Sequence, residues 1–303
     1  MPDPRDAADA FGLLADPTRV AILETFAVAT ADLEVDSDGT MPELSFSEIY
    51  DLVEVDSTSQ LSYHLEQLDG TYLTHTEAGW RYTFAGEAVV RLLLSEAYAG
   101  APDVEGIHRE EQCPYCESVG FRVFVDDLIL FRECEHCERL MGGLPVTPAQ
   151  VRERSEESLL SSSQRRMAAF YWLFREGVCN ECGAGIDIAF TDLRDREEIP
   201  FGWVISGQCR QCLRSLNGPP QMWFLSHPAS VSFHWEHGVD ALRIGLAEMT
   251  ARITGGDWTA SRPTADTVAV TYRLEDAHLR LTATEDLEVT DVERVRRGPV
   301  DGG

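Results

Sequence analysis

The chain has 303 residues, of which 52 are acidic and 25 are basic, so its formal net charge is −27. All the basic residues are arginine. Hydrophobic residues make up 44% of the sequence, which is enough to build packed cores and excludes a disordered acidic polymer. The acidic excess without lysine indicates adaptation to molar salt, which screens self-repulsion while carboxylates keep the surface hydrated.

The length predicts two or three compact domains. The sequence has no apolar run of membrane-spanning length and no basic, apolar leader at its start. We therefore expect a cytoplasmic protein with no membrane partner. Its eight cysteines form four Cys-x2-Cys pairs, and in a reducing cytosol this pattern predicts metal ligation and not structural disulfides.

The first hundred residues begin with helical patterns. Asp16 followed by Pro17 combines an N-cap acid with proline at the first helical position, which predicts a helix to about residue 27, after a shorter helix over residues 6–14. Residues 29–44 are acidic and contain glycine and proline, so they predict a loop. A third helix is expected to begin at Ser47.

Residues 57–68, STSQLSYHLEQL, read as a helix suited to insertion into a partner. Ser57 followed by Gln60 forms a capping box, which predicts the helix start. Helical spacing separates an apolar face from a polar one; the apolar face carries Leu61, Leu65 and Leu68, and the polar face carries Ser59, Ser62, Tyr63 and Glu66. Short hydroxyls and one aromatic ring can reach base edges and phosphates in a major groove. An ordinary surface helix is the alternative interpretation.

After Asp69-Gly70 the pattern changes to two strands, residues 72–76 and 80–83, joined by a loop with Gly79. Thr83 then caps a last helix over residues 84–98. This helix is apolar on nearly every side, so we expect a second subunit to cover it. Helices, a tight turn, a polar second helix and a hairpin together predict a winged helix-turn-helix.

The segments FGLLADPTRVAILETF, FSEIYDLV and STSQLSYHLEQL with the hairpin resemble the winged helix-turn-helix of ArsR-type transcriptional regulators, in the variety found in halophilic archaea. The resemblance covers about the first third of the chain. Its most specific pieces are ADPTRVAIL and LSYHL. It implies double-stranded DNA as partner and a homodimer joined through the first and last helices of this domain.

The resemblance also assigns site residues. It implies that the second helix enters the major groove and that Arg81 lies on the wing; the expected DNA-contacting residues are Ser57, Thr58, Ser59, Gln60, Ser62, Tyr63, His64 and Arg81. For His64, a role in positioning the helix and a base contact both remain open. The first third contains no cysteine, so the cysteine-based sensing of arsenic or cadmium known for some members does not carry over.

Charge opposes DNA binding by this domain. Residues 1–98 contain four arginines and 19 acidic residues, a net charge of 4 − 19 = −15, whereas DNA-binding domains normally have a basic face. Phosphate neutralisation should contribute little affinity. Molar salt shortens the Debye length to roughly 3 Å, so binding would depend on hydrogen bonds, apolar contacts and shape, with cations bridging carboxylates and phosphates.

Residues 99–112 contain glycine, proline and acids and predict a linker. Cys113 and Cys116 follow, and Cys134 and Cys137 come after 17 intervening residues. Alternating apolar residues between the pairs predict a hairpin. Four thiolates at this spacing can close a tetrahedron around one zinc ion, which predicts a first zinc ribbon over residues 113–145.

The remaining residues, 146–303, predict an α+β region that contains a second zinc ribbon over residues 179–212. Its ligands would be Cys179, Cys182, Cys209 and Cys212, with strands at residues 185–190 and 202–207. Pairing between sequence neighbours closes shorter loops and is preferred to a cross-pairing of the first knuckle with the third or fourth. A helical stretch over residues 148–175, interrupted near residues 161–163, separates the two ribbons.

The last part of the sequence offers a histidine cluster, His227, His234 and His237, with Glu236. Its spacing does not match His-Glu-x-x-His, and the apolar residues behind Pro228 favour a packed helix over a metal site. A helix over residues 239–253 and strands at residues 268–274, 278–284 and 287–295 should follow. Neither ribbon shows an open coordination position or a nearby general base, so we predict no enzyme.

The sequence thus predicts an α+β chain with an N-terminal winged helix-turn-helix (residues 1–98), two zinc-ribbon-like units of four cysteines with one zinc ion each, and a small C-terminal α+β region. The function it favours is a sequence-specific, repressor-like transcriptional regulator whose zinc-stabilised C-terminal module senses a signal or binds a partner. The alternative is a protein-binding adaptor of the transcription machinery, because a winged helix followed by a zinc ribbon also resembles archaeal transcription factor E. An enzyme has only the histidine cluster in its favour.

Overall fold

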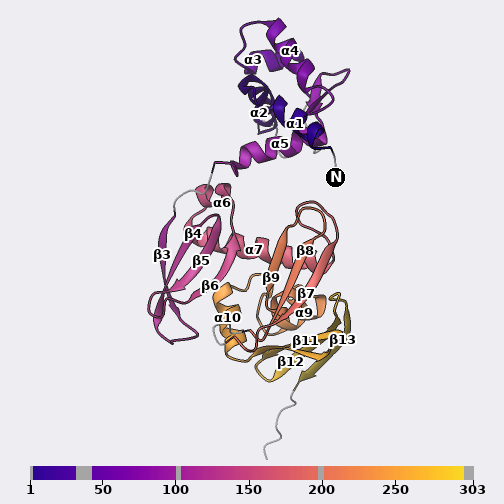
Figure 1. The fold of residues 1–303 in the computed structure, drawn as a ribbon. Coiled ribbons are helices and arrows are strands. Elements are labelled where there is room, and N and C mark those ends of the chain that lie inside the picture. Colours follow the sequence, from indigo (N-terminus) through magenta and orange to yellow (C-terminus); the bar gives the residue numbers. More distant parts are fainter. Residues whose placement is uncertain (1–2, 32–42, 100–103, 197–200, 297–303) are drawn as a thin grey trace, which may run out of the picture. The chain divides into compact units, whose positions relative to one another are not determined.

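The computed structural model describes residues 3–31, 43–99, 104–196 and 201–296 (Figure 1). It is a mixed α+β structure whose described strands form antiparallel sheets of two, four, three and four strands. The chain divides into two units, described here one at a time: a smaller unit, residues 3–99, with which Thr147–Ala149 also groups, and a larger unit that takes up the rest. No helix among the described residues is long and apolar enough to cross a bilayer.

The smaller unit consists of five helices and one hairpin within the described ranges. In chain order these are α1 (Pro4–Leu13), α2 (Pro17–Ala31), α3 (Phe46–Leu52), α4 (Thr58–Leu68), β1 (Leu73–His75), β2 (Trp80–Tyr82) and α5 (Phe84–Ser95). Each lies within a few residues of its predicted position. The predicted acidic loop falls largely on residues 32–42, outside the described residues.

Helix starts in the smaller unit follow from capping side chains. Asp16 accepts a hydrogen bond from the backbone N–H of Thr18 at 2.9 Å, ahead of α2. Helix α3 begins earlier than the predicted Ser47, because Ser45 and Glu48 cap each other in a full capping box. Thr83 caps α5 through the N–H of Gly86, as the sequence predicts.

The tip of the hairpin β1–β2 makes a close backbone contact with the segment that precedes α3. Leu44 forms an isolated bridge with Trp80, with backbone hydrogen bonds of 2.9 and 2.8 Å. Gly79 precedes this bridge with φ +156°, and a Cβ atom on it would lie 2.3 Å from the carbonyl oxygen of Leu44. Glycine is therefore required at the tip, where the backbone of residues 43–45 approaches the hairpin.

The larger unit contains three sheets and five helices in its described part. In chain order these are β3 (Val104–Gln112), β4 (Val119–Asp126), β5 (Ile129–Cys134), β6 (Leu140–Pro145), α6 (Pro148–Glu153), α7 (Glu156–Arg175), β7 (Ile186–Asp192), β8 (Trp203–Cys209), β9 (Ser215–Gly218), α8 (Pro220–Phe224), α9 (Pro228–Glu236), α10 (Leu246–Thr254), β10 (Trp258–Thr264), β11 (Thr267–Leu274), β12 (Ala277–Thr284) and β13 (Val289–Arg296). The sheets pair in sequence order: β3-β4-β5-β6, β7-β8-β9 and β10-β11-β12-β13.

One hydrophobic core runs through the larger unit. It includes Val123 and Leu144 of the first sheet, Ile205 of the second, and Trp258 and Tyr272 of the third, all 3% exposed or less. The sequence predicts the first ribbon as a domain of its own. In the structure its inner face instead packs into the same core as residues 150–296, because a four-stranded sheet exposes more apolar surface than one small metal unit can cover.

Four expectations for the larger unit need correction. Strand β3 occupies most of the predicted linker 99–112, and its Ile107 is buried against β4. Helix α7 runs uninterrupted through residues 161–163, because the hydroxyls of Ser162 and Ser163 donate to the carbonyl of Leu159.

Helix α10 begins only after Gly245, which is its N-cap. Strand β10 was not predicted. It is an edge strand, and its polar, proline-containing sequence does not show the apolar alternation typical of a strand.

Candidate functional site

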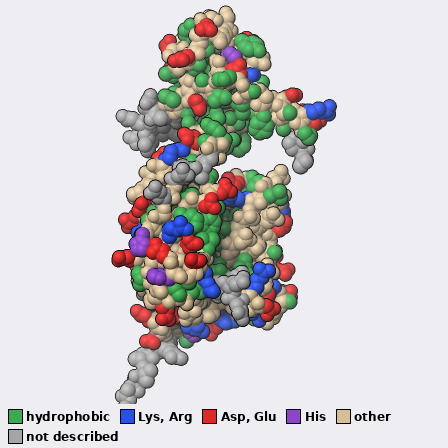
Figure 2. All heavy atoms as spheres, turned by 60° about the vertical axis from the view of Figure 1, so that its left-hand side comes forward, with side chains coloured by type: hydrophobic (Ala, Val, Ile, Leu, Met, Phe, Trp, Pro, Cys, Tyr) green, Lys and Arg blue, Asp and Glu red, His purple; other side chains and the backbone are tan. Residues whose placement is uncertain are grey.

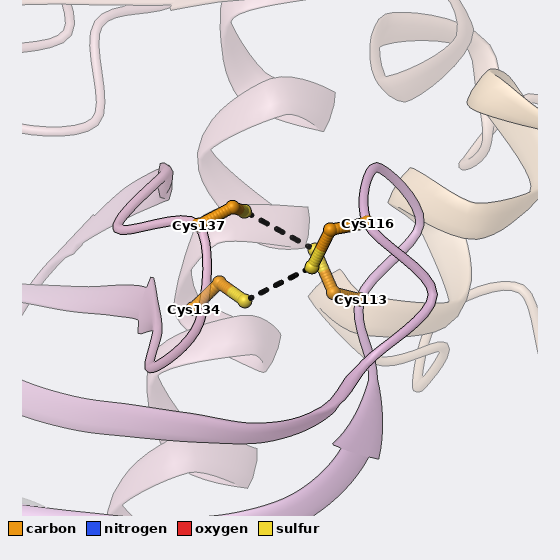
Figure 3. Close-up of side chains that lie close together, drawn as sticks. All are labelled: Cys113, Cys116, Cys134 and Cys137. Atoms are coloured by element: carbon orange, nitrogen blue, oxygen red, sulfur yellow. Dashed lines mark hydrogen bonds between the residues drawn. The ribbon is translucent and has the colours of Figure 1, made fainter.

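The first cysteine quartet lies where two turns of the first sheet face each other (Figure 3). Cys113 and Cys116 come from the β3–β4 turn, and Cys134 and Cys137 come from the end of β5 and the β5–β6 turn. The Sγ atoms of Cys113 and Cys137 are 3.8 Å apart, those of Cys116 and Cys134 are 3.6 Å apart, and all four lie within 4.8 Å of one another. A tetrahedral ion with metal–sulfur bonds of about 2.3 Å places its ligand sulfurs about 3.8 Å apart.

The second quartet has the same construction. Cys179 and Cys182 lie between α7 and β7, and Cys209 and Cys212 lie in the β8–β9 turn. The Sγ atoms of Cys179 and Cys212 are 3.6 Å apart, and those of Cys182 and Cys209 are 3.4 Å apart. Sequence neighbours therefore form each quartet, and the cross-pairing of knuckles is wrong.

The four turns that carry the cysteines share one backbone geometry. The residue after the second cysteine of each pair has a positive φ: Glu117 +62°, Glu138 +54°, Gly183 +74° and Leu213 +60°. In three of the turns a backbone N–H also points at the first cysteine's sulfur, at 3.3–3.5 Å, from Tyr115, Glu181 and Gln211. Such N–H groups favour thiolate over thiol, which is the form that ligates metal.

The thiols of the first quartet do not ionise alike without a cation. The backbone N–H of Ser118 is the main cause that lowers the pKa of Cys116 to about 6. Burial and the neighbouring thiols raise the pKa of Cys137 to about 12. A divalent cation at the centre would hold all four as thiolates, because its charge outweighs the effects that raise the pKa of Cys137. Each quartet can thus hold one metal ion such as zinc, with all four positions taken by protein ligands.

Helix α4 presents two different faces. Its buried residues are Leu61, His64, Leu65 and Leu68. Residues of the opposite face, with the N-cap, are exposed or half-buried: Ser57, Thr58, Ser59, Gln60, Ser62 and Tyr63. The N-cap hydroxyl of Ser57 accepts from the N–H of Gln60 at 3.2 Å, and the Gln60 side chain accepts from the N–H of Asp56 at 2.9 Å. Tyr63 has 58% of its surface exposed.

His64 must be removed from the expected DNA-contacting residues. Its side chain is 7% exposed, and its Nδ1 lies 4.0 Å from a carboxylate oxygen of Asp16, the residue that caps α2. Its ring stands edge-on to that of Tyr63, with centroids 5.3 Å apart. A buried imidazole cannot reach a base edge. His64 therefore helps to position α4 and the ring of Tyr63 from the buried face of the helix. His64 shares the inner face with Leu61, Leu65 and Leu68, which decides between the two roles that the sequence left open.

Arg81 is exposed on β2 and lies near one acid. Its Nε is 3.8 Å from Glu43, and the two side chains are 55% and 32% exposed. An exposed pair at this distance contributes little to stability, so the guanidinium remains free to contact another anion. Within residues 57–83, Arg81 is the one basic residue other than histidine.

The histidine cluster of α9 does not form a metal site. The ring nitrogen of His227 accepts from the N–H of Ala229, His234 contacts the carbonyl of Ser230, and His237 contacts the carbonyl of Phe233. Each ring is thus tied to the backbone of its own helix. Among the described residues, the two cysteine quartets are the groups that bring three or more metal-ligating side chains together.

Sequence patterns gave no sign of a pocket in the larger unit. Its walls come from β6, α7, the β9–α8 junction and α10, and its volume is about 340 Å³. Tyr115 and Arg139 of the first cysteine-bearing turns also line it. Segments this distant in sequence come together only in the folded chain. The aromatic- and methionine-containing residues 167–174 of α7 contribute Met167 and Tyr171 to the pocket's walls.

Two family models match the chain. One, described as Domain of unknown function (DUF7351), matches residues 110–289, which include both cysteine quartets. The other, described as Domain of unknown function (DUF7347), matches residues 7–93, which include α4 and the hairpin. No curated protein and no solved structure matches the chain.

Proposed function

The chain belongs to the DUF7351 family, and we propose that it is a sequence-specific, repressor-like transcriptional regulator that binds double-stranded DNA as a homodimer. In this proposal residues 3–99 form the DNA-binding winged helix-turn-helix. Residues 104–296 form a sensing module stabilised by two zinc ions.

The observation that carries the proposal is the division of α4 into two faces. Three leucines and His64 hold the helix against the core of the smaller unit. Serines, a threonine and Tyr63 face outward and are exposed. Hydroxyls and a tyrosine can donate and accept hydrogen bonds at base edges, and a helix fits the width of the major groove.

The neighbours of α4 support this assignment. Helix α3 precedes it after a short turn, and the hairpin β1–β2 with exposed Arg81 follows it. A recognition helix preceded by a shorter helix and followed by a wing is the order used in winged helix-turn-helix proteins. The resemblance of ADPTRVAIL and LSYHL to ArsR-type regulators favours the same role.

Two helices of the smaller unit support a homodimer. Helix α1 buries none of its own residues, and Phe11 on it is 64% exposed. On α5, Leu92 and Leu94 are 50% and 54% exposed. A helix of ten residues is marginal without packing. Exposed apolar side chains on the surface of a domain mark an interaction surface. A second copy of the same surface can cover both helices at once.

Zinc is the metal we propose for both quartets. Four thiolates in a closed tetrahedron fit a structural zinc ion, and no ligand position is left for substrate. In this assignment the ions fix the turns between strands and take no part in a reaction. The proposal therefore includes no enzymatic activity.

The test is selection of genomic DNA by the protein in molar potassium chloride. We expect an enriched inverted repeat, since a twofold dimer reads two half-sites. Replacing Ser62 and Tyr63 by alanine should weaken binding to that repeat at least tenfold, since each base contact contributes about 1–3 kcal/mol. Dimerisation and metal content should not change.

Ser261→Ala is the matched control, because Ser261 is exposed on β10 of the larger unit and should leave DNA affinity unchanged. Unchanged affinity in the Ser62→Ala/Tyr63→Ala variant would remove α4 from the groove. The absence of any enriched repeat would contradict the regulator itself.

A second candidate function, an adaptor of the transcription machinery, has one observation in its favour. Helix α4 has no arginine, and Glu66 lies on its exposed face, so the face suits a basic or polar protein surface as well as DNA. Co-purification with RNA polymerase, together with failure of the DNA selection, would favour the adaptor.

A further inference from the structure

The pocket of the larger unit is shaped to hold a small molecule. Its volume of about 340 Å³ lies in the range of ligand sites, which bury most of a molecule with on the order of 20 non-hydrogen atoms. Figure 2 shows hydrophobic side chains gathered in a hollow on the visible face of this unit. The pocket's floor and walls are mostly apolar, with Tyr171, Leu246 and Ile253 among them.

The apolar wall is unusually adaptable because it contains methionine. The protein has six methionines, and the four within the described residues, Met141, Met167, Met222 and Met249, all line this pocket. Three of them also line a second cavity of about 30 Å³ behind it. Methionine changes rotamer easily and contacts aromatic rings favourably, so side-chain movement can join the two spaces around a larger apolar ligand.

The described residues that line the pocket include no acidic side chain. In a chain with 52 acidic residues among 303, about three would be expected among twenty lining positions, yet none of the described lining residues is acidic. The charged group that does line it is the arginine at position 139. A carboxylate on a ligand would therefore meet no repulsion from the described lining.

Arg139 is held in a way that leaves it able to bind an anion. Its guanidinium lies over the ring of Tyr115, 4.3 Å from the ring centroid. Many arginines of this chain form ion pairs, for example Arg122 with Glu133 at 2.6 Å, whereas no described carboxylate lies within ion-pair distance of Arg139. The guanidinium also donates a side-chain hydrogen bond to the Tyr115 hydroxyl. A guanidinium has five N–H donors, so others remain to contact a carboxylate.

We propose that this pocket binds an apolar monocarboxylate, with the hydrocarbon or aromatic part among the methionines and the carboxylate on Arg139. The use of such a ligand as a regulatory signal rests on the proposed function. Binding itself requires only the larger unit's pocket and is measured without DNA.

Calorimetric titration of the full chain, loaded with metal and in molar potassium chloride, provides the test. The probes are 4-phenylbutyrate and its neutral amide, 4-phenylbutanamide. We expect one saturable site per chain for the acid and at least fivefold weaker binding of the amide. Absence of saturable binding by both compounds would overturn the proposal, and equal affinity for both would overturn the role of Arg139.

Variants test the carboxylate contact at Arg139 and the apolar cavity separately. Arg139→Gln should reduce the affinity for the acid at least fivefold and leave that for the amide unchanged. Arg273→Gln is the matched control, because Arg273 is exposed on β11 and does not line the pocket. Met222→Trp should fill the cavity and abolish binding of both compounds, whereas Val292→Trp, on β13, should not. Undiminished binding by Met222→Trp would place the site elsewhere and overturn the proposal.

A second test measures ligand binding on the wild-type protein itself and uses variants only to assign its signals. With methionine methyl groups labelled by carbon-13, the signals of Met141, Met167, Met222 and Met249 should shift in proportion to calorimetric occupancy. Each signal is assigned by a single Met→Leu substitution. Binding without a shift in any of these four signals would contradict the pocket as the site.

Discussion

At the scale of single residues, the two buried histidines differ in surroundings and in consequence. His64 lies beside Asp16. His234 has no exposed surface, and the rings of Phe233, Trp258 and Tyr272 enclose it. Burial lowers the pKa of His234 to about 4, more than its hydrogen bond to the Ser230 carbonyl raises it.

The first prediction concerns acid sensitivity at His234. Its folded pKa of about 4 is below the ordinary value of about 6.5, so the unfolded chain takes up a proton first as the pH falls. The contribution of neutral His234 to the free energy of unfolding is complete above pH 6.5 and is lost as the pH falls from 6.5 to 4. By linkage the loss is roughly 3 kcal/mol. Arg252 and His237 also lower this pKa, and Glu248 opposes them.

The measurement is denaturant unfolding across this pH range in the wild type and in His234→Met. Protonation of the eight cysteines is common to both proteins, so the difference between the pH dependences of their unfolding free energies reports on His234 alone. We expect a shallower pH dependence in the variant, even though it is less stable at pH 7. Parallel curves for the two proteins would contradict the assignment.

The same residues show which side-chain roles could be predicted from sequence. Cysteine spacing predicted both metal quartets, because knuckle geometry is local and four thiolates leave few alternatives. The role of His64 remained open, since helical spacing gives a face but not its neighbour, Asp16. Arg139 and Met141 are neighbours in the sequence, but Met167, Met222 and Met249 lie on distant segments, and no local pattern relates them to Arg139.

At the scale of elements, boundaries with a capping side chain were predicted within a few residues, as for α4 and α5. The predicted elements were wrong where tertiary contacts determine the local structure. Strand β3 forms because Ile107 finds the core of the larger unit. Serines in the middle of α7 do not break it, because their hydroxyls are satisfied by carbonyls of the preceding turn.

The second prediction concerns the metal-bearing turns. Elemental analysis should give two zinc ions per chain, and Cys116→Ser should give one. Because metal binding supplies folding free energy to such units, this variant should destabilise the larger unit by several kcal/mol. Hydrogen exchange in α4 should not change, since both quartets lie outside the smaller unit.

His136→Ala is the matched control for the metal prediction. His136 lies inside the second knuckle, but its Nε2 is 3.0 Å from the carbonyl of Val119, and the quartet is complete without it. We expect this variant to keep two zinc ions. A wild-type content below one ion per chain would rule out the ribbons.

The third prediction concerns α1 and α5 as a dimer surface. Phe11→Asp and Leu92→Asp place a desolvated charge in the proposed interface, which should convert the dimer to monomer in sedimentation at molar salt. Leu52→Asp is the control, because Leu52 on α3 is 53% exposed, similar to Leu92 at 50%, yet lies outside α1 and α5. A wild-type monomer, or dissociation by Leu52→Asp alone, would contradict this surface.

At the scale of the whole molecule, charge determines the conditions in which the proposed function is available. The net charge is −27, and the proposed DNA-binding unit is itself negatively charged. At low salt the repulsion between this unit and phosphates is unscreened. At molar salt the Debye length falls to roughly 3 Å, so only groups in near contact interact.

The last prediction follows for the salt dependence of DNA affinity. A regulator that neutralises six to ten phosphates loses affinity steeply with salt, with a slope of about −0.9 per phosphate on logarithmic axes. Here Arg81 is the one arginine between residues 57 and 83, so a dimer brings two to the recognition helices and wings. We expect a slope no steeper than about −2 between 0.5 and 3 M potassium chloride, measured by fluorescence anisotropy on the selected repeat. Arg81→Gln should bring the slope close to zero, and a wild-type slope of −6 or steeper would mean that other basic groups hold the phosphates.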